Sequence, residues 1–199
     1  MQELWDQRFS EEGFAYGSDP NLFFKEELDK HTPGKILLLG EGEGRNGVYA
    51  AQIGWQVDAF DFSSAAREKA LKLAKSKGVE LNYTLQDLQD ITLPENYYDA
   101  SALIYLHLDP QLRSQLIKKV IKALKPGGII IMEVFDKEQL GRTSGGPKDP
   151  ELLYSLEEIV EKFADLDFIT LSKEVTEINE GKYHQGESVL IRFVGAKVE

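Results

Sequence analysis

An apolar run that breaks into alternating glycines constrains this chain more than any other feature. Residues 36–47 are Ile-Leu-Leu-Leu-Gly-Glu-Gly-Glu-Gly-Arg-Asn-Gly, so an expected strand leads into a loop that holds Gly40, Gly42 and Gly44. Glycine has no β-carbon, which lets its backbone turn sharply and lets a ligand come close. A helix that begins near Arg45 would aim its free amides and positive dipole end at that ligand. The pattern predicts a nucleotide-type ligand, and a tight strand-to-helix turn without a ligand is the alternative.

An acidic residue lies at the end of the next expected strand, about twenty residues later. The strand 56–60 leads directly into Asp61. A carboxylate at this place in a nucleotide-binding sheet reaches the hydroxyls of a ribose. Asp61 could alternatively do no more than cap the helix that follows it.

The order of apolar runs and turn signals is typical of a doubly wound α/β fold. The expected strands are 35–39, 56–60, 80–85, 98–105 and 128–135, and the expected helices are 2–9, 21–30, 45–53, 64–77 and 111–124. This alternation predicts a mostly parallel sheet with helices on both faces. We expect Asn21 to cap the second helix, and Ser63 or Ser64 to cap the helix 64–77.

The last third of the chain has a different pattern. Residues 136–150 are rich in turn formers and poor in apolar residues, which predicts a long loop of the kind that often serves function. A helix over 156–163 follows. Residues 167–178 and 187–198 then alternate as two strands around Asn179-Glu-Gly-Lys, a hairpin signal. No boundary of a second domain is visible, so residues 1–199 are expected to form one domain.

Charge and composition narrow the classes of partner. The 34 acidic and 23 basic residues give a net charge of −11, which disfavours nucleic acid and favours a small molecule. No stretch is apolar over the roughly 18 residues that a membrane helix needs, and the first residues do not resemble a secretory signal. Cysteine is absent, which fits a reducing cytoplasm, and three dispersed histidines predict no metal site. No feature specifies an oligomeric state.

Several motifs together resemble the Rossmann-like methyltransferases that use S-adenosylmethionine. They are the glycine loop, Asp61, Gln86-Asp87-Leu88, Tyr98-Asp99-Ala and, most specifically, Leu124-Lys-Pro-Gly-Gly128. The resemblance covers nearly the whole chain and implies a three-layer sandwich whose mostly parallel seven-stranded sheet carries an antiparallel C-terminal hairpin strand. The chain is most similar to the small-molecule branch of tellurite-resistance and thiopurine-type enzymes through Trp5-Asp-Gln-Arg8-Phe9, Tyr16-Gly17, Pro20-Asn21, Glu41–Asn46, Gly145-Gly-Pro147 and Tyr183-His184.

The resemblance implies S-adenosylmethionine as cofactor and a thiol, chalcogen oxyanion or amine as acceptor. The implied cofactor-binding residues are Gly40, Glu41, Gly42, Glu43, Asn46, Asp61, Phe62, Ser63, Asp87, Leu88 and Tyr105. Many family members place an acid two residues before the first loop glycine to meet the methionine ammonium, and this chain has Leu38 there. Glu41 or Glu43 is therefore expected to take that role. Asp87 and the Leu88 amide are expected to meet the adenine amino group, and a solvated acid is the alternative for Asp87.

His107 is the predicted catalytic residue. It follows the fourth expected strand, at the edge where such sheets bind ligands, and imidazole can take a proton near neutral pH. Its alternative is a histidine of the core or of the helix entry, and His184 and Glu133 are weaker candidates. Methyl transfer from a sulfonium needs alignment and exclusion of water more than an acid or a base, so the reaction can also proceed without one.

We expect three segments of the domain to have different roles. Residues 1–30 form a helical lid, 35–135 the cofactor-binding core, and 136–199 a substrate-side loop, helix and hairpin. The lid would use Trp5, Phe9, Phe14 and Tyr16, whose alternative is an amphipathic helix packed on the core.

Two other functions compete with methyl transfer. A nicotinamide-dependent oxidoreductase is disfavoured because the chain has no Tyr-x-x-x-Lys pair and because Leu-Lys-Pro-Gly-Gly has no function there. A non-catalytic protein that binds S-adenosylmethionine stays open.

Overall fold

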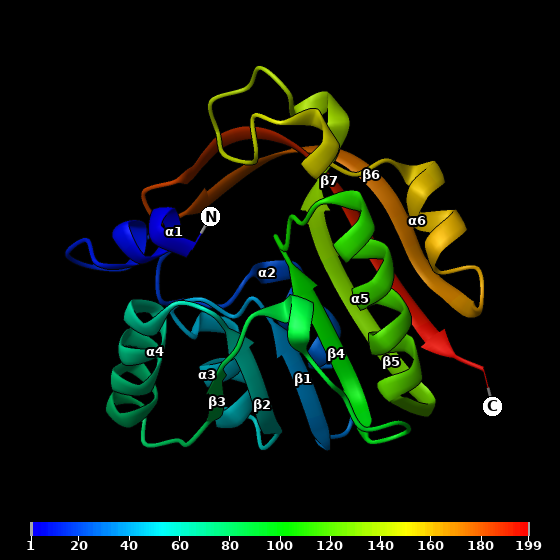
Figure 1. The fold of residues 1–199 in the computed structure, drawn as a ribbon, viewed down its shortest axis with the longest axis horizontal. Coiled ribbons are helices and arrows are strands. Elements are labelled where there is room, and N and C mark those ends of the chain that lie inside the picture. The colour runs from blue at the N-terminus through cyan, green and yellow to red at the C-terminus, as the bar shows by residue number, and fades with distance from the viewer. Residues whose placement is uncertain (1, 199) are drawn as a thin grey trace.

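The computed structural model describes residues 2–198 and contains one seven-stranded sheet (Figure 1). The strands are β1 (Lys35–Leu39), β2 (Gln56–Asp61), β3 (Asn82–Leu85), β4 (Tyr98–Ile104), β5 (Leu124–Phe135), β6 (Leu166–Glu180) and β7 (His184–Lys197). Their order is β3-β2-β1-β4-β5-β7-β6, and β7 runs antiparallel to both β5 and β6. The expected Rossmann-like architecture is confirmed.

Helices cover both faces of the sheet. They are α1 (Gln2–Phe9), α2 (Leu22–Leu28), α3 (Arg45–Gln52), α4 (Ser64–Ser76), α5 (Pro110–Ala123) and α6 (Leu156–Lys162), with short 3-10 turns η1 (Leu88–Asp90), η2 (Lys137–Gln139) and η3 (Pro150–Leu152). The helices α2, α3 and α4 pack on one face, and α5 and α6 pack on the other. Asn21 caps α2 by accepting from the Phe24 amide at 2.9 Å, and Ser63 rather than Ser64 caps α4.

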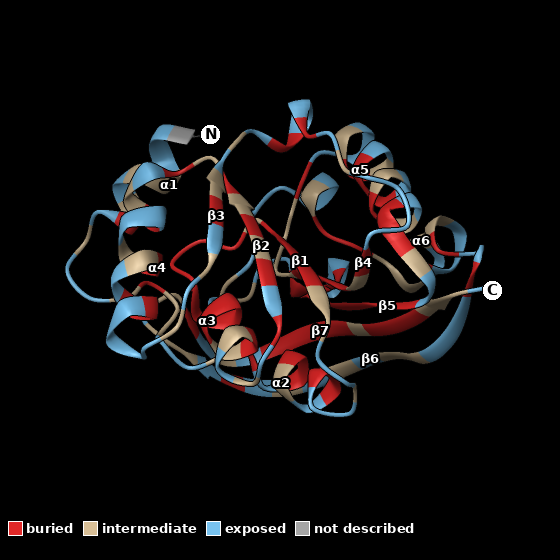
Figure 2. Ribbon diagram, turned by 90° about the horizontal axis from the view of Figure 1, so that it is seen from below, coloured by how far each residue is buried: buried red, intermediate tan, exposed pale blue. Residues whose placement is uncertain are grey.

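The apolar run of β1 is continuous because both faces of the strand are buried. Leu37 and Leu39 pack toward α5, whereas Ile36 and Leu38 pack toward α2 and α3, and none is more than 2% exposed. Each such side chain stabilises the fold by roughly 1.5–3 kcal/mol relative to an exposed one. Figure 2 shows this burial continuing through β4, β5 and β7, while β6 at the sheet edge is largely half-buried or exposed. The centre of the sheet is therefore a rigid platform for the residues at its ends.

The largest differences from the predicted strand boundaries are at the start of β5 and at the β6–β7 turn. The strand β5 starts at Leu124 rather than Gly128, because Lys-Pro-Gly-Gly forms a bulge between the pairs Tyr98–Leu124 and Ala100–Ile129. The hairpin turn lies two residues later than predicted. Glu180 pairs with His184, so Asn179 and Glu180 belong to β6.

The hairpin tip reaches across the molecule to the segment that follows α1. Figure 1 shows β6 and β7, in orange and red, arching over the sheet until their tip lies beside α1. The Lys182 amide donates to the Ala15 carbonyl at 2.9 Å, and a β-carbon on Gly181 would clash with the Gly17 nitrogen. This contact brings residues from both ends of the chain to the carboxyl ends of β1 and β4. No helix within residues 2–198 has the length and apolar character to span a membrane.

Candidate active site

A cavity of about 590 Å³ lies where the carboxyl ends of β1 and β4 meet the hairpin tip. Its floor is the glycine loop together with Ile104 and Tyr105, and its walls come from α1, the 143–152 segment and the hairpin tip. The predicted residues that line it are Gly40, Glu41, Gly42, Glu43, Asn46, Tyr105 and His107. This is the edge of an open α/β sheet at which ligands bind.

The glycine loop has a left-handed backbone conformation at Gly42 and Gly44, which favours glycine at both positions. Gly44 has φ +88° and directly precedes α3, where a β-carbon would lie 2.8 Å from the Ala70 Cα atom. Gly42 has φ +60° and donates its amide to Asp61 Oδ2 at 3.0 Å. The loop therefore packs tightly on α4 while its amides stay near the sheet end.

Asp61 joins this loop to the start of α4. Its Oδ2 accepts from Gly42 and its Oδ1 accepts from the Ser63 amide at 2.9 Å, and the residue is 7% exposed. Burial raises its pKa. Asp61 does not line the cavity, and the Ser63 hydroxyl beside it is hydrogen-bonded to Asp6 of α1. The local hydrogen bonds of the capping alternative are present, and the ribose contact stays a prediction.

The two glutamates of the loop have different partners. Glu43 is fully engaged, because it accepts from the Ala15 amide at 2.7 Å and pairs with Lys69 at 2.8 Å. Glu41 accepts from the Gly47 amide at 2.6 Å, and within residues 2–198 it has no ion-pair contact with a lysine or arginine. Burial raises the pKa of Glu41 to about 8. Of the two, Glu41 is the acid left for a cation entering the cavity.

A buried polar network lies behind the cavity floor. The Asn21 side chain donates to Glu133 at 2.6 Å and to Glu180 at 2.9 Å, and its backbone amide donates to Asn46 at 2.9 Å. Tyr105 donates its hydroxyl to Glu133 at 2.8 Å. The φ of Tyr105 is +50°, an uncommon conformation for a bulky residue that persists only when its surroundings hold it. The network fixes Tyr105 at the cavity surface.

His107 lines the cavity, but the backbone engages its ring. Nδ1 lies 2.8 Å from the Leu152 carbonyl oxygen, and Nε2 accepts from the Phe135 amide at 3.4 Å. The ring stacks on Phe135, and burial lowers its pKa to about 4. This geometry favours the packing alternative, since a base role requires one of these contacts to break.

His184 lies opposite, on the hairpin tip. Its Nδ1 is 3.5 Å from Glu180 Oε2, which also accepts from Arg45 at 3.1 Å. Burial lowers the pKa of His184. Burial alone would raise the pKa of Glu180, but the hydrogen bond from His184 and the charge of Arg45 outweigh it and hold that pKa at about 2. His184 was a candidate from the sequence. Glu180 and Arg45 were not, because only the register of the hairpin and the start of α3 bring them to His184.

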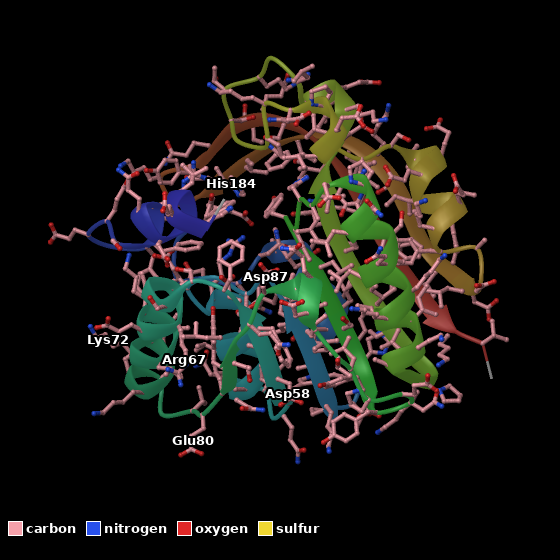
Figure 3. All side chains as sticks on the ribbon, in the orientation of Figure 1. Asp58, Arg67, Lys72, Glu80, Asp87 and His184 are labelled. Carbon is pink, nitrogen blue, oxygen red and sulfur yellow. The ribbon has the colours of Figure 1, made fainter. Side chains whose placement is uncertain are left out.

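The residues expected at the adenine end lie outside the cavity. Asp87 is exposed and caps η1 by accepting from the Gln89 amide at 2.9 Å, while Leu88 is buried in the core. Ser63 is buried and Phe62 is half-buried at the end of β2. Figure 3 labels Asp87 below the hairpin that carries His184. The adenine contacts of Asp87 and Leu88 stay predictions.

The N-terminal aromatics divide between lid and core. Trp5 and Phe9 stack at 5.5 Å and line the cavity with Tyr16, whereas Phe14 packs behind α3 and α4. Arg8 lies 4.4 Å from the Tyr183 ring centre and donates to the Tyr16 hydroxyl at 2.8 Å. The helix α1 therefore covers the cavity while packing on α4. No group of three metal-binding side chains occurs in the described chain.

A family model described as a methyltransferase domain matches residues 36–128, from β1 through the bulge of β5. The probable S-adenosyl-L-methionine-dependent methyltransferase TehB of Haemophilus influenzae is 20% identical over 164 residues. Over this region the chain is similar to the class I, Rossmann-like methyltransferases. The match to TehB covers 81% of this chain and 56% of TehB, so this chain spans little more than half the length of that relative.

Two further proteins are similar to this chain. A 2-heptyl-1-hydroxyquinolin-4(1H)-one methyltransferase of Mycobacteroides abscessus is 25% identical over 143 residues, covering 69% of this chain and 61% of the relative. The crystal structure of the N-methyltransferase NodS from Bradyrhizobium japonicum WM9, in complex with S-adenosyl-l-homocysteine, superposes with a TM-score of 0.74. It is 14% identical and covers 100% of this chain and 98% of NodS, so the likeness shows the fold.

Proposed function

We propose that this chain transfers a methyl group from S-adenosylmethionine to a small-molecule acceptor. The observation that carries the proposal is the cavity of about 590 Å³ whose floor is the glycine loop of a methyltransferase-family sheet. The half of the cavity nearest the loop would receive the methionine end of the cofactor. The half beneath the hairpin tip would receive the acceptor.

The residues of the loop suit this cofactor. Glu41 is a buried carboxyl at the cavity surface that forms no ion pair within residues 2–198, which fits the methionine ammonium. Asp61 holds the loop from the end of β2, where a ribose would meet it. A β-carbon on Gly40 would lie 2.7 Å from the Leu106 side chain, so a larger residue at this position would force Leu106 to move. When bound, the cofactor supplies the activated methyl group, and the chain supplies alignment and exclusion of water.

The acceptor end of the cavity favours an aromatic or apolar small molecule. Its walls include Trp5, Tyr16, Phe135 and Tyr183. The relative from Mycobacteroides abscessus is named for a hydroxyquinolone acceptor, which adds a ring hydroxyl to the thiol, chalcogen oxyanion or amine that the sequence suggests. The net charge of −11 disfavours nucleic acid as the substrate. The absence of cysteine supports a cytoplasmic location, and the continuous sheet supports a single domain with residues 1–30 as its lid.

A turnover screen tests the proposal. The chain is incubated with S-adenosylmethionine and with thiols, phenols, amines, selenite or tellurite, and S-adenosylhomocysteine is measured as product. We expect product with at least one acceptor class. Lys72→Ala changes an exposed side chain of α4 and should keep the wild-type rate. Asp61→Ala should need a higher concentration of S-adenosylmethionine to reach the same rate. Absence of product with every class would reject the enzymatic proposal.

Binding measurements separate the two competing functions. A ligand at about a hundred times its dissociation constant stabilises a fold by roughly 2.7 kcal/mol. Stabilisation by S-adenosylhomocysteine without turnover would indicate a non-catalytic cofactor-binding protein. Stabilisation by NAD alone would indicate an oxidoreductase.

A further inference from the structure

His184 is closely packed on the acceptor side of the cavity. It is 5% exposed, and the rings of Tyr16, Tyr105 and Phe135 surround it at centroid distances of 4.5, 4.4 and 5.2 Å. A β-carbon on Gly145 would lie 2.7 Å from its Cδ2 atom, so the 143–152 segment packs closely on the ring edge. Figure 3 shows His184 on the inner side of the β6–β7 arch. The ring is held in place by neighbours on several sides.

Glu180 determines which nitrogen of His184 is available. With Oε2 of Glu180 at 3.5 Å, Nδ1 is the nitrogen that carries the proton and donates. Among the hydrogen bonds of residues 2–198, none involves Nε2, whereas the backbone engages both ring nitrogens of His107. Nε2 of His184 is therefore an acceptor without a partner in the described chain, on a residue that lines the cavity.

We propose that His184, oriented by Glu180, is the general base that removes the proton of an aryl hydroxyl acceptor during methyl transfer. This inference rests on the proposed function. A carboxylate behind Nδ1 fixes the tautomer and stabilises the imidazolium that forms when Nε2 takes a proton.

The step balances without another reactant. The acceptor O–H bond breaks, and its proton moves to Nε2 of His184. The acceptor oxygen forms a bond to the methyl carbon, the carbon–sulfur bond breaks, and its electron pair stays on sulfur, which leaves as a neutral thioether. His184 then returns the proton to solvent.

The chemistry of the cavity selects an aryl hydroxyl among the acceptors. An aromatic thiol ionises by itself near neutral pH and needs no base, whereas an aryl hydroxyl is mostly protonated there. The rings around His184 offer flat apolar surface on which an aromatic acceptor can pack.

Charged and titratable groups from every neighbouring element face His184. They are Glu180 on β6, Arg45 on α3, Arg8 on α1, Tyr16 after α1, Tyr105 and His107 after β4, and Tyr183 beside it. Arg45 and Arg8 disfavour the imidazolium, while Glu180 favours it. Burial keeps the imidazole neutral at pH 7, which is the form a base needs.

Kinetics with acceptors of different acidity test the proposal. The amide introduced by His184→Asn can donate to Glu180 but has no basic nitrogen. We expect this variant to methylate 1-naphthol about a hundredfold more slowly at pH 7, with the defect shrinking as pH approaches the acceptor's own pKa. Turnover of thiophenol and the affinity for S-adenosylhomocysteine should change little. His31→Asn, which alters a histidine between α2 and β1 outside the cavity, is the matched control and should behave as wild type.

Nitrogen NMR of the histidine side chains gives a readout that does not depend on turnover. At pH 7 we expect His184 to be neutral with its proton on Nδ1, and Glu180→Gln should lower its pKa further. A proton on Nε2 at pH 7 would overturn the inference even if His184→Asn failed to fold. The inference would also be overturned if His184→Asn lost naphthol and thiophenol turnover equally, or if the wild-type protein methylated thiophenol but no phenol. Either result would leave the proposed function intact. Failure to bind S-adenosylhomocysteine at all would reject both.

Discussion

Glu41→Gln tests whether the glycine loop holds an unpaired buried acid. The pKa of Glu41 is about 8 in the fold against an ordinary value of 4.5. Ionising Glu41 therefore costs about 5 kcal/mol more in the folded chain than in the unfolded chain. Because the folded chain keeps a proton that the unfolded chain releases above about pH 4.5, the free energy of unfolding should fall as pH rises from about 5 to about 8.

Glutamine preserves the contact with the Gly47 amide but cannot ionise. Urea unfolding followed by circular dichroism at pH 5, 6.5 and 8.5 measures the effect. Relative to wild type, Glu41→Gln should gain roughly 3–5 kcal/mol between the lowest and the highest pH. Glu68→Gln, which changes an exposed acid of α4, is the matched control and should show no comparable gain. Parallel curves for wild type and Glu41→Gln would refute the raised pKa.

The same residue links cofactor binding to proton release. A methionine ammonium beside Glu41 would favour the carboxylate, so binding at pH 7 should expel close to one proton from wild type and none from Glu41→Gln. Titration calorimetry with S-adenosylhomocysteine in buffers of different ionisation enthalpy counts that proton. Release that persists in Glu41→Gln would show that another group meets the ammonium.

Three further substitutions test the surrounding site. Asp61→Ala should lower the affinity for S-adenosylhomocysteine by about ten- to a hundredfold, equivalent to about 1.5–3 kcal/mol, while circular dichroism shows that the chain stays folded. Unchanged affinity by calorimetry would mean that Asp61 is only a local cap. His107→Asn should keep turnover within a few-fold at neutral pH, because both ring nitrogens are held by the backbone; a hundredfold loss at unchanged cofactor affinity would establish the base role instead. Gly44→Ala should lower the unfolding free energy by more than about 1 kcal/mol in urea, because φ is +88° and the Ala70 Cβ atom would lie 2.6 Å from the added carbon; wild-type stability would mean the loop relaxes freely.

Local signals in the sequence were sufficient for most of the sheet. The strand β1 lies where it was expected because its apolar run is bounded by Gly34 and Gly40, and both faces of the strand are buried. The hairpin turn was misplaced because alternation alone does not say where a strand stops. Its position is set by the packing of Gly181 against Gly17, a contact between residues far apart in sequence.

The sequence predicts only part of the candidate site. The glycine loop is continuous in sequence, so spacing predicts its position at a strand end and the start of α3. The network that joins Asn21 to Glu133 spans 112 positions, and that between Asn21 and Glu180 spans 159. Only the folded arch of β6 and β7 brings such residues together. The strand-end rule likewise placed His107 at the cavity but could not show that the Leu152 carbonyl binds its ring.

Transfer of a labelled methyl group tests the central claim most directly. The chain is incubated with S-adenosylmethionine that carries a trideuterated methyl group and with an acceptor from the turnover screen, and both products are measured by mass spectrometry. The proposed function predicts labelled acceptor and S-adenosylhomocysteine in equal amounts. Tight binding of the cofactor with no label on any acceptor would contradict it.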